Sequence, residues 1–228
     1  NPLLSGRERT FSRFLYYRLF YGNTKPTILC EGKTDNIYLK SAINKLVTGY
    51  PELAKVKATE YELLIRFLEY SKRTRFLLEL YGGTSYLNYF ISKFDNHYKF
   101  YKAPKPQQPV IIVLDNDIGF TGKNGGGIAS KIKKIDSTTA YPATSKKDDY
   151  RNADFIHVMH NLYIVLTPLS SNGKDTDIEY LFDDATRLKK YSGKCFNTID
   201  KRNDKVDLSK DSFAQHIIKM KKNTINFN

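Results

Sequence analysis

Residues 110–117 read VIIVLDND, and this stretch decides the fold. Its five apolar residues in succession are typical of a strand that is buried on both faces in a parallel sheet. The preceding connector, KAPKPQQP at 102–109, contains three prolines in eight residues and cannot continue a helix. We therefore expect a central parallel strand that begins at residue 110 and ends at Asp115 and Asp117.

Two further segments indicate the same architecture. TILCEG at 27–32 is a short apolar run, and residues 33–47 follow it with apolar side chains at helical spacing, which predicts strand, tight turn and helix. DFIHVMHNLYIVLTP at 154–168 predicts two antiparallel strands around His160-Asn161. Strands that alternate with helices favour an α/β fold, Rossmann-like, with a mainly parallel sheet flanked by helices.

The remaining elements are predicted more simply. In the first half of the chain we expect a basic N-terminal helix within 6–22 that stops at Gly22, a helix over 58–70, and a second strand-turn-helix unit from FLLELYGG at 76–83. A basic helix should follow the glycine-rich residues 122–127. Near the C-terminus we expect a short acidic helix at 175–183, capped by Asp175 or Asp177, and a final helix at 209–222.

Composition restricts the partners. Lys and Arg number 37 against 24 Asp and Glu, a net charge of +13 that favours a polyanion, with nucleic acid first. A basic surface that is merely solvated is the alternative. No apolar run approaches the ~20 residues needed to cross a bilayer, so we expect no membrane partner. The two cysteines, Cys30 and Cys195, form no zinc or CxxC spacing and fit a reducing cytosol.

Carboxylates gather at the predicted strand ends. Glu31 follows the strand at 27–30, and Asp115 and Asp117 follow the strand at 110–114. Functional groups in an open parallel sheet collect beyond the carboxyl ends of the strands. Converging carboxylates repel one another, so either their pKa values rise or a cation neutralises them, and Mg²⁺ prefers oxygen ligands. Turn formation by Asp115 and Asp117, and helix N-terminal charge for Asp35, are the alternatives.

The motifs Glu31-Gly32-x-Thr34-Asp35 and Asp115-x-Asp117-x-Gly119, in this order, resemble the TOPRIM domain over residues 26–185. Topoisomerases, bacterial primases and overcoming-lysogenization-defect nucleases share this domain, and the sequence is most similar to the nuclease branch. The resemblance implies that Glu31, Asp115 and Asp117 are catalytic and hold one or two Mg²⁺ ions, or Mn²⁺ in their place. It also implies that Asp35 and Glu179 complete the metal ligands and that Lys210 matches a late lysine near the site.

Lysines near these motifs are candidates for contacts to the phosphates of a nucleic acid. They are Lys33, Lys123, Lys131, Lys133, Lys134 and Lys210. Solvated positions on a helix or loop are the alternative for each.

The basic N-terminal segment and the first TOPRIM motif also resemble the C-terminal TOPRIM module fused to retron reverse transcriptases. This resemblance implies that residues 1–25 are a helical linker from a preceding reverse transcriptase domain and that residues 26–228 are the nuclease domain. It further implies a bacterial, cytoplasmic effector of anti-phage defence within an RNA-directed DNA polymerase, whose partners are that domain and the retron RNA-linked DNA. Homo-oligomerisation is left open.

Three other functions compete with the nuclease. Primase-like nucleotidyl transfer occurs in the same superfamily, and a non-catalytic module that docks nucleic acid would use the basic surface alone. A topoisomerase is least favoured, because strand passage needs a tyrosine nucleophile on a separate domain.

Overall fold

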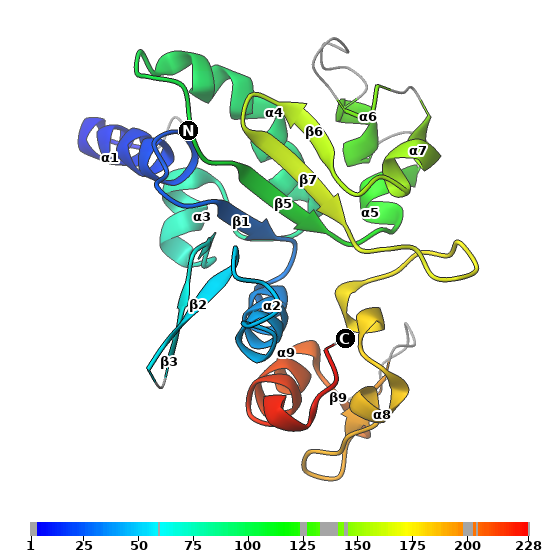
Figure 1. Ribbon diagram of the computed structural model, residues 1–228. Coiled ribbons are helices and arrows are strands. Elements are labelled where there is room, and N and C mark those ends of the chain that lie inside the picture. Colours follow the sequence, from blue (N-terminus) through cyan, green and yellow to red (C-terminus); the bar gives the residue numbers. More distant parts are fainter. Residues whose placement is uncertain are drawn as a thin grey trace. The chain divides into compact units, whose positions relative to one another are not determined.

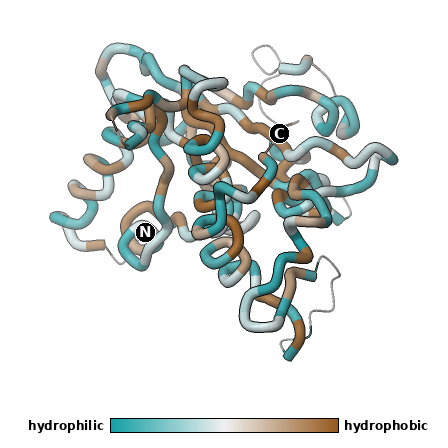
Figure 2. The backbone as a smooth tube through the Cα atoms, turned by 60° about the horizontal axis from the view of Figure 1, so that its bottom comes forward, coloured by the Kyte–Doolittle hydropathy of each residue, from teal (hydrophilic) through white to brown (hydrophobic). Residues whose placement is uncertain are grey.

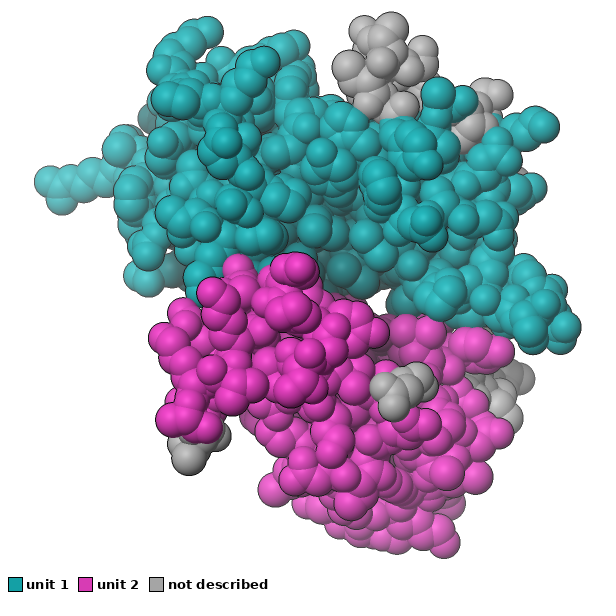
Figure 3. All heavy atoms as spheres, viewed as in Figure 1, with its two compact units in different colours: residues 1–31, 65–176 teal, residues 32–64, 177–228 magenta. Residues whose placement is uncertain are grey.

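The protein is described by a computed structural model (Figure 1), which covers residues 4–58, 60–123, 127–132, 141–143, 146–197, 203 and 205–227. The chain forms two compact units, each coloured separately in Figure 3. Unit 1 comprises residues 1–31 and 65–176, and unit 2 comprises residues 32–64 and 177–228. Each unit is therefore built from two separate stretches of sequence.

Unit 1 contains the main sheet and most of the helices. Its elements are α1 (Gly6–Tyr16), the π-helical η1 (Tyr17–Tyr21), β1 (Thr27–Cys30), β4 (Arg66–Phe67), α3 (Lys72–Leu78), α4 (Thr84–Phe100), β5 (Val110–Leu114), α5 (Ile118–Thr121), α6 (Ile128–Ile132), α7 (Lys147–Arg151), β6 (Ile156–Met159) and β7 (Leu162–Leu166).

The sheet of unit 1 has the strand order β4-β1-β5-β7-β6. Strands β4, β1, β5 and β7 are parallel, and β6 pairs antiparallel with β7. In register, Cys30 lies opposite Val113, so β1 and β5 end side by side. The expected α/β fold with a mainly parallel sheet and the expected 154–168 hairpin are both confirmed.

One face of this sheet carries the core of unit 1. Residues in β5 and β7 alternate between buried and half-buried positions, as a strand with period two requires. Helix α4 contributes Leu87, Phe90, Ile91 and Phe94, which share one helix face and are all buried. The hydrophobic stretches alternate with hydrophilic ones along the backbone in Figure 2.

The N-terminal helix belongs to this core. Ser5 and Glu8 form a capping box at the start of α1, and η1 ends at Gly22 as the sequence predicts. Phe20 is buried, and its ring lies 4.9 Å from that of Phe90 on α4. The segment therefore packs Tyr16, Phe20 and Tyr21 into unit 1, while Phe11 and Phe14 remain exposed.

Unit 2 has a smaller core of its own. Its elements are α2 (Lys33–Lys45), β2 (Ala54–Lys57), β3 (Glu60–Leu63), the 3₁₀ helix η3 (Ile178–Leu181), α8 (Asp184–Arg187), β8 (Cys195–Phe196), β9 (Asp207–Leu208), α9 (Lys210–Ser212), the π-helical η4 (Phe213–Lys219) and η5 (Lys222–Thr224). Tyr38 from α2 and Phe213 from η4 pack together in this core, with ring centroids 6.1 Å apart. The expected helices at 33–47, 175–183 and 209–222 are confirmed, the second as a 3₁₀ turn capped by Asp177.

The helix expected over 58–70 is wrong. Residues 60–63 form β3, which pairs antiparallel with β2, and residues 66–67 form the edge strand β4. A turn at Ala58, whose φ is 48°, reverses the chain, and a Lys57–Glu62 ion pair at 2.7 Å joins the two strands. Cross-strand pairing outweighs the helix-like spacing of the apolar residues here.

The strand expected within 76–83 is also wrong. Residues 72–78 form α3, which starts at a capping box between Ser71 and Thr74 and ends where Glu79 adopts the left-handed conformation. The apolar residues 76–78 are the last turn of this helix. The glycine pair that follows leads directly into α4, so that part of the prediction is confirmed.

None of the helices in the described ranges combines the length and apolarity that a bilayer crossing requires.

Candidate metal centre

Glu31 and Asp115 lie side by side at the carboxyl ends of β1 and β5. The backbone N–H of Glu31 donates to the carbonyl of Val113 at 3.0 Å, which extends the parallel pairing of the two strands by one residue. The Oε2 atom of Glu31 in turn accepts from the backbone N–H of Asp115 at 3.3 Å. The strand register thus places these two predicted site residues on the same edge of the sheet.

Asn116 separates the two aspartates and fixes their orientation. It is completely buried, and its side-chain amide donates to the Thr167 carbonyl at 3.0 Å and accepts from the Arg151 guanidinium at 2.8 Å. Because Asn116 is anchored on the inner side, Asp115 and Asp117 are both left half-buried on either side of it. Sequence reasoning gave this asparagine no role.

Asp117 has a structural role in addition to its predicted one. Its Oδ1 atom accepts from the backbone N–H of Gly119 at 2.6 Å and caps the short helix α5. A Cβ atom on Gly119 would lie 2.8 Å from the Thr84 hydroxyl oxygen and 3.0 Å from Asp117 Oδ1. Because residue 119 is a glycine, its backbone can lie this close to the Thr84 and Asp117 side chains.

Thr84 is a site residue that the sequence analysis missed. It is the first residue of α4, and its hydroxyl donates to Glu31 Oε1 at 2.5 Å. The preceding glycines hold it there, because Gly83 donates its N–H to the Glu31 carbonyl at 2.7 Å. Gly82 has a φ of 86°, and a Cβ atom on it would lie 2.9 Å from the same carbonyl oxygen. The Gly-Gly-Thr sequence before a helix was the available signal.

Glu179 belongs to a polar cluster within unit 2. Its side chain is completely buried and accepts from Lys210 Nζ at 2.8 Å and from the Tyr38 hydroxyl at 3.2 Å. Lys210 also reaches Asp177 Oδ2 at 3.4 Å. Burial raises the pKa of Glu179 to about 7, although the Lys210 ammonium opposes that rise. Lys210 is thus paired with carboxylates, with its side chain 51% exposed.

Asp35 lies in the same unit as Glu179. Its Oδ2 atom accepts from the Gly32 backbone N–H at 2.6 Å, which caps α2. Burial raises the pKa of Asp35, and the Gly32 hydrogen bond and the Lys210 charge act in the opposite direction. The helix-capping interpretation of Asp35 therefore accounts for its observed contact.

The structure places the other lysines at the surface. Lys33 is exposed in the first turn of α2, Lys123 is exposed after α5, and Lys131 is exposed on α6. Lys133 and Lys134 lie outside the described residues.

Two groups of predicted site residues therefore emerge, one in each unit. Glu31, Asp115 and Asp117 supply only oxygen donors from neighbouring strand ends, which is the donor chemistry that Mg²⁺ prefers. Within the described ranges, however, no three acidic, His or Cys side chains converge closely enough to hold a metal ion. The hydrogen bonds of Glu31 to Thr84 and of Asp117 to Gly119 occupy oxygens that would ligate. The oxygen donors of these three residues and their positions at neighbouring strand ends fit a Mg²⁺ site. Their side-chain orientations in this structure do not bring the three carboxylates together around one ion.

No family model matches this sequence, and no solved structure matches the chain.

Proposed function

We propose that this chain is a metal-dependent nuclease of the TOPRIM type that hydrolyses phosphodiester bonds in DNA or RNA. The observation that carries the proposal is the pairing of Glu31 with Asp115 at the ends of adjacent parallel strands, with Asp117 two residues further on. This edge of a parallel sheet is where α/β proteins place their functional groups. The net charge of +13 supports a polyanionic substrate.

Asp115 and Asp117 would hold Mg²⁺, with Glu31 as a third ligand or as general base. A bound Mg²⁺ supplies charge stabilisation for the phosphate and lowers the pKa of a ligating water. Thr84 holds Glu31 by the 2.5 Å hydrogen bond, which leaves Oε2 facing the Asp115 amide. In this arrangement Thr84 is a positioning residue, and Glu31 Oε2 is the atom that would accept the proton of the attacking water.

The biological setting proposed for this activity comes from the resemblance to retron proteins. We propose that the nuclease is the effector of an anti-phage system, that it acts in the bacterial cytoplasm, and that a reverse transcriptase domain with its RNA-linked DNA restrains it. The basic character of residues 6–22, which contain four arginines, is consistent with an adjacent nucleic acid.

Cleavage assays on matched variants test the proposal. Labelled single- and double-stranded DNA and RNA would be incubated with the wild type, Glu31→Gln and Asp115→Asn, each with Mg²⁺, with Mn²⁺ and with EDTA. Glu52→Gln and Asp154→Asn are the controls, because both carboxylates are exposed. We expect metal-dependent cleavage that both site variants lose and both controls keep.

A second candidate is a non-catalytic docking module, which the internal hydrogen bonds of Glu31 and Asp117 favour. If folded wild-type protein binds the nucleic acids but cleaves none of them with either metal, the docking module replaces the nuclease. Incorporation of nucleotides on a single-stranded template would instead identify primase-like transfer.

A further inference from the structure

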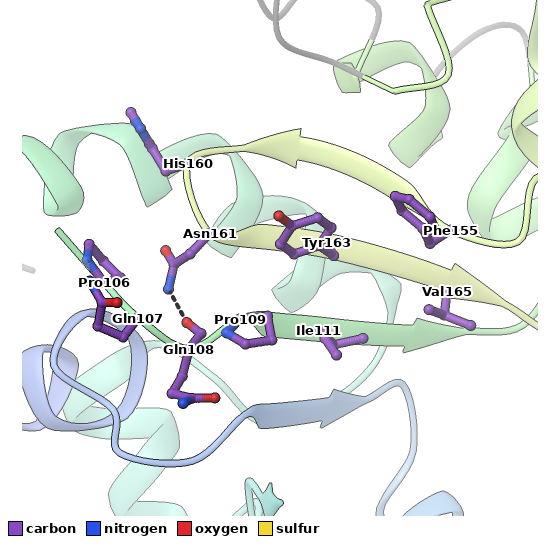
Figure 4. A pocket seen from close by; sticks show the side chains of 10 residues that line it. All are labelled: Pro106, Gln107, Gln108, Pro109, Ile111, Phe155, His160, Asn161, Tyr163 and Val165. Carbon is purple, nitrogen blue, oxygen red and sulfur yellow. Dashed lines mark hydrogen bonds between the residues drawn. The ribbon is translucent and has the colours of Figure 1, made fainter. Parts of the chain in front are cut away.

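The second face of the unit 1 sheet carries an apolar groove that the carboxylate site does not use. It has a volume of about 470 Å³ and lies over β5 and β7 (Figure 4). Its floor is made by Ile111, Tyr163 and Val165, the half-buried positions that alternate with the core residues of these strands. A sheet face with half-exposed apolar side chains indicates a surface that takes a partner.

Aromatic rings form one side of this groove. Phe155, which is 43% exposed, lies 6.2 Å from the ring of Tyr163 at an interplanar angle of 61°. Tyr141, which is 54% exposed, stacks on Phe155 with ring centroids 5.0 Å apart. Partly exposed aromatic rings such as these can stack on unpaired bases.

Polar and cationic groups lie at the other end of the groove. Gln107, Gln108 and Asn161 line it with side-chain amides, and no Asp or Glu stands among its described lining residues. Gln107 donates to the Lys105 carbonyl at 3.0 Å, which places an exposed lysine next to the groove. The Asn23 amide donates to the Lys25 and Pro109 carbonyls, which holds the backbone before β1 against this end of the groove.

We propose that this groove binds single-stranded nucleic acid, with bases stacked on Phe155 and Tyr163 and phosphates near Lys105. Aromatic faces with amides and lysines but no lining carboxylate match the chemistry of a base and its phosphate. The groove extends along β5 and β7 from Pro109 to Val165, and Val165 pairs with Val113, two residues before Asp115. Nucleic acid bound here therefore contacts side chains other than the carboxylates and extends toward the strand ends that carry them.

This inference rests on the proposed function only in taking nucleic acid as the partner. Binding would be measured by fluorescence anisotropy in EDTA, in the Asp115→Asn background as well as in the wild type, so that cleavage plays no part in the result. The probes are labelled oligothymidylate, oligouridylate and an abasic oligonucleotide of the same length. Loss of nuclease activity and loss of groove binding are then separate results.

Phe155→Ala and Tyr163→Ala are expected to weaken binding of oligothymidylate or oligouridylate roughly 5- to 150-fold each, as the removal of one stacking ring does. Phe155→Tyr and Tyr163→Phe should bind like the wild type, because each keeps its ring. Phe76→Ala is the matched control, since Phe76 on α3 is 44% exposed and lies outside the groove.

Two further readouts distinguish stacking from general charge attraction. The abasic probe should bind wild type more weakly than oligothymidylate does, and the alanine variants should lower that preference. Lys105→Gln should reduce the slope of log affinity against log salt by about 1.

Unchanged oligonucleotide affinity in folded Phe155→Ala and Tyr163→Ala proteins would overturn the proposal. So would a change in oligomeric state, measured by light scattering, without a change in affinity, because the groove would then be a protein interface.

Discussion

Burial of the Glu179 carboxyl should make unit 2 lose stability as the pH rises from 4.5 to about 7. The side chain is 0% exposed, and burial raises its pKa from 4.5 to about 7. Between these two pH values the folded protein holds a proton that the unfolded chain releases. The contribution of Glu179 to stability is therefore fully present below pH 4.5 and is lost as the pH rises through about 7.

The size of the effect follows from the two pKa values. A rise from 4.5 to about 7 corresponds to about 3 kcal/mol of folding free energy. Glu179→Gln removes the titration but keeps an oxygen that can accept from the Tyr38 hydroxyl, whose present distance is 3.2 Å. The free energy of unfolding of the wild type, taken relative to this variant, should fall by about 3 kcal/mol between a pH below 4.5 and a pH above 7.

Hydrogen exchange on the amides of α2 and η4 would measure this difference in the free energy of unfolding within unit 2. Urea unfolding provides a second measurement. Titrating groups that do not interact with Glu179 are common to both proteins and cancel in the comparison. A difference between wild type and variant that stays constant across this pH range would refute the reasoning, because Glu179 would then have an ordinary pKa in the folded protein.

Three other changes have defined outcomes. Lys210→Met removes the cation that lowers the pKa of Glu179, so the pKa of that carboxyl, followed by NMR titration, should rise above about 7. Thr84→Val removes the hydroxyl that positions Glu31, so metal-dependent cleavage should fall roughly 10- to 100-fold while Thr84→Ser retains it; equal activity of the two variants would contradict the positioning role. Ile112→Ala truncates a completely buried side chain in β5 and should lower the free energy of unfolding by about 2–5 kcal/mol in urea titrations.

The central strands and their acidic ends could be predicted from the sequence, because each strand and the carboxylate that follows it are encoded in one short stretch of residues. An apolar run followed by Asp115 or Glu31 fixes both the strand and the position of the carboxylate at its end. The parallel arrangement of β1 and β5 then places the two acids on one edge. The helix at 33–47 was equally local, since its first turn holds the Asp35 that caps it.

Other features depend on contacts between distant residues and could not be predicted. Thr84 reaches Glu31 across 53 residues, and Tyr38 reaches Glu179 across 141. The spacing of apolar residues at 58–70 fits a helix, but pairing with β2 and β1 decides their conformation. A sequence motif identifies candidate carboxylates such as Glu31. It does not show which side chains, such as Thr84, donate hydrogen bonds to their oxygen atoms.

The division of the units along the chain has a consequence for synthesis on the ribosome. Every strand of the unit 1 sheet has been made once residue 166 is complete, whereas α2 needs the segment from residue 177 onward to form its core. At about 5–20 residues per second, residues 32–64 wait roughly 10 to 30 s for the residues that cover them. During that interval the apolar face of α2, including Tyr38, is open to chaperones, and newly made protein has the sheet before it has the Glu179 cluster.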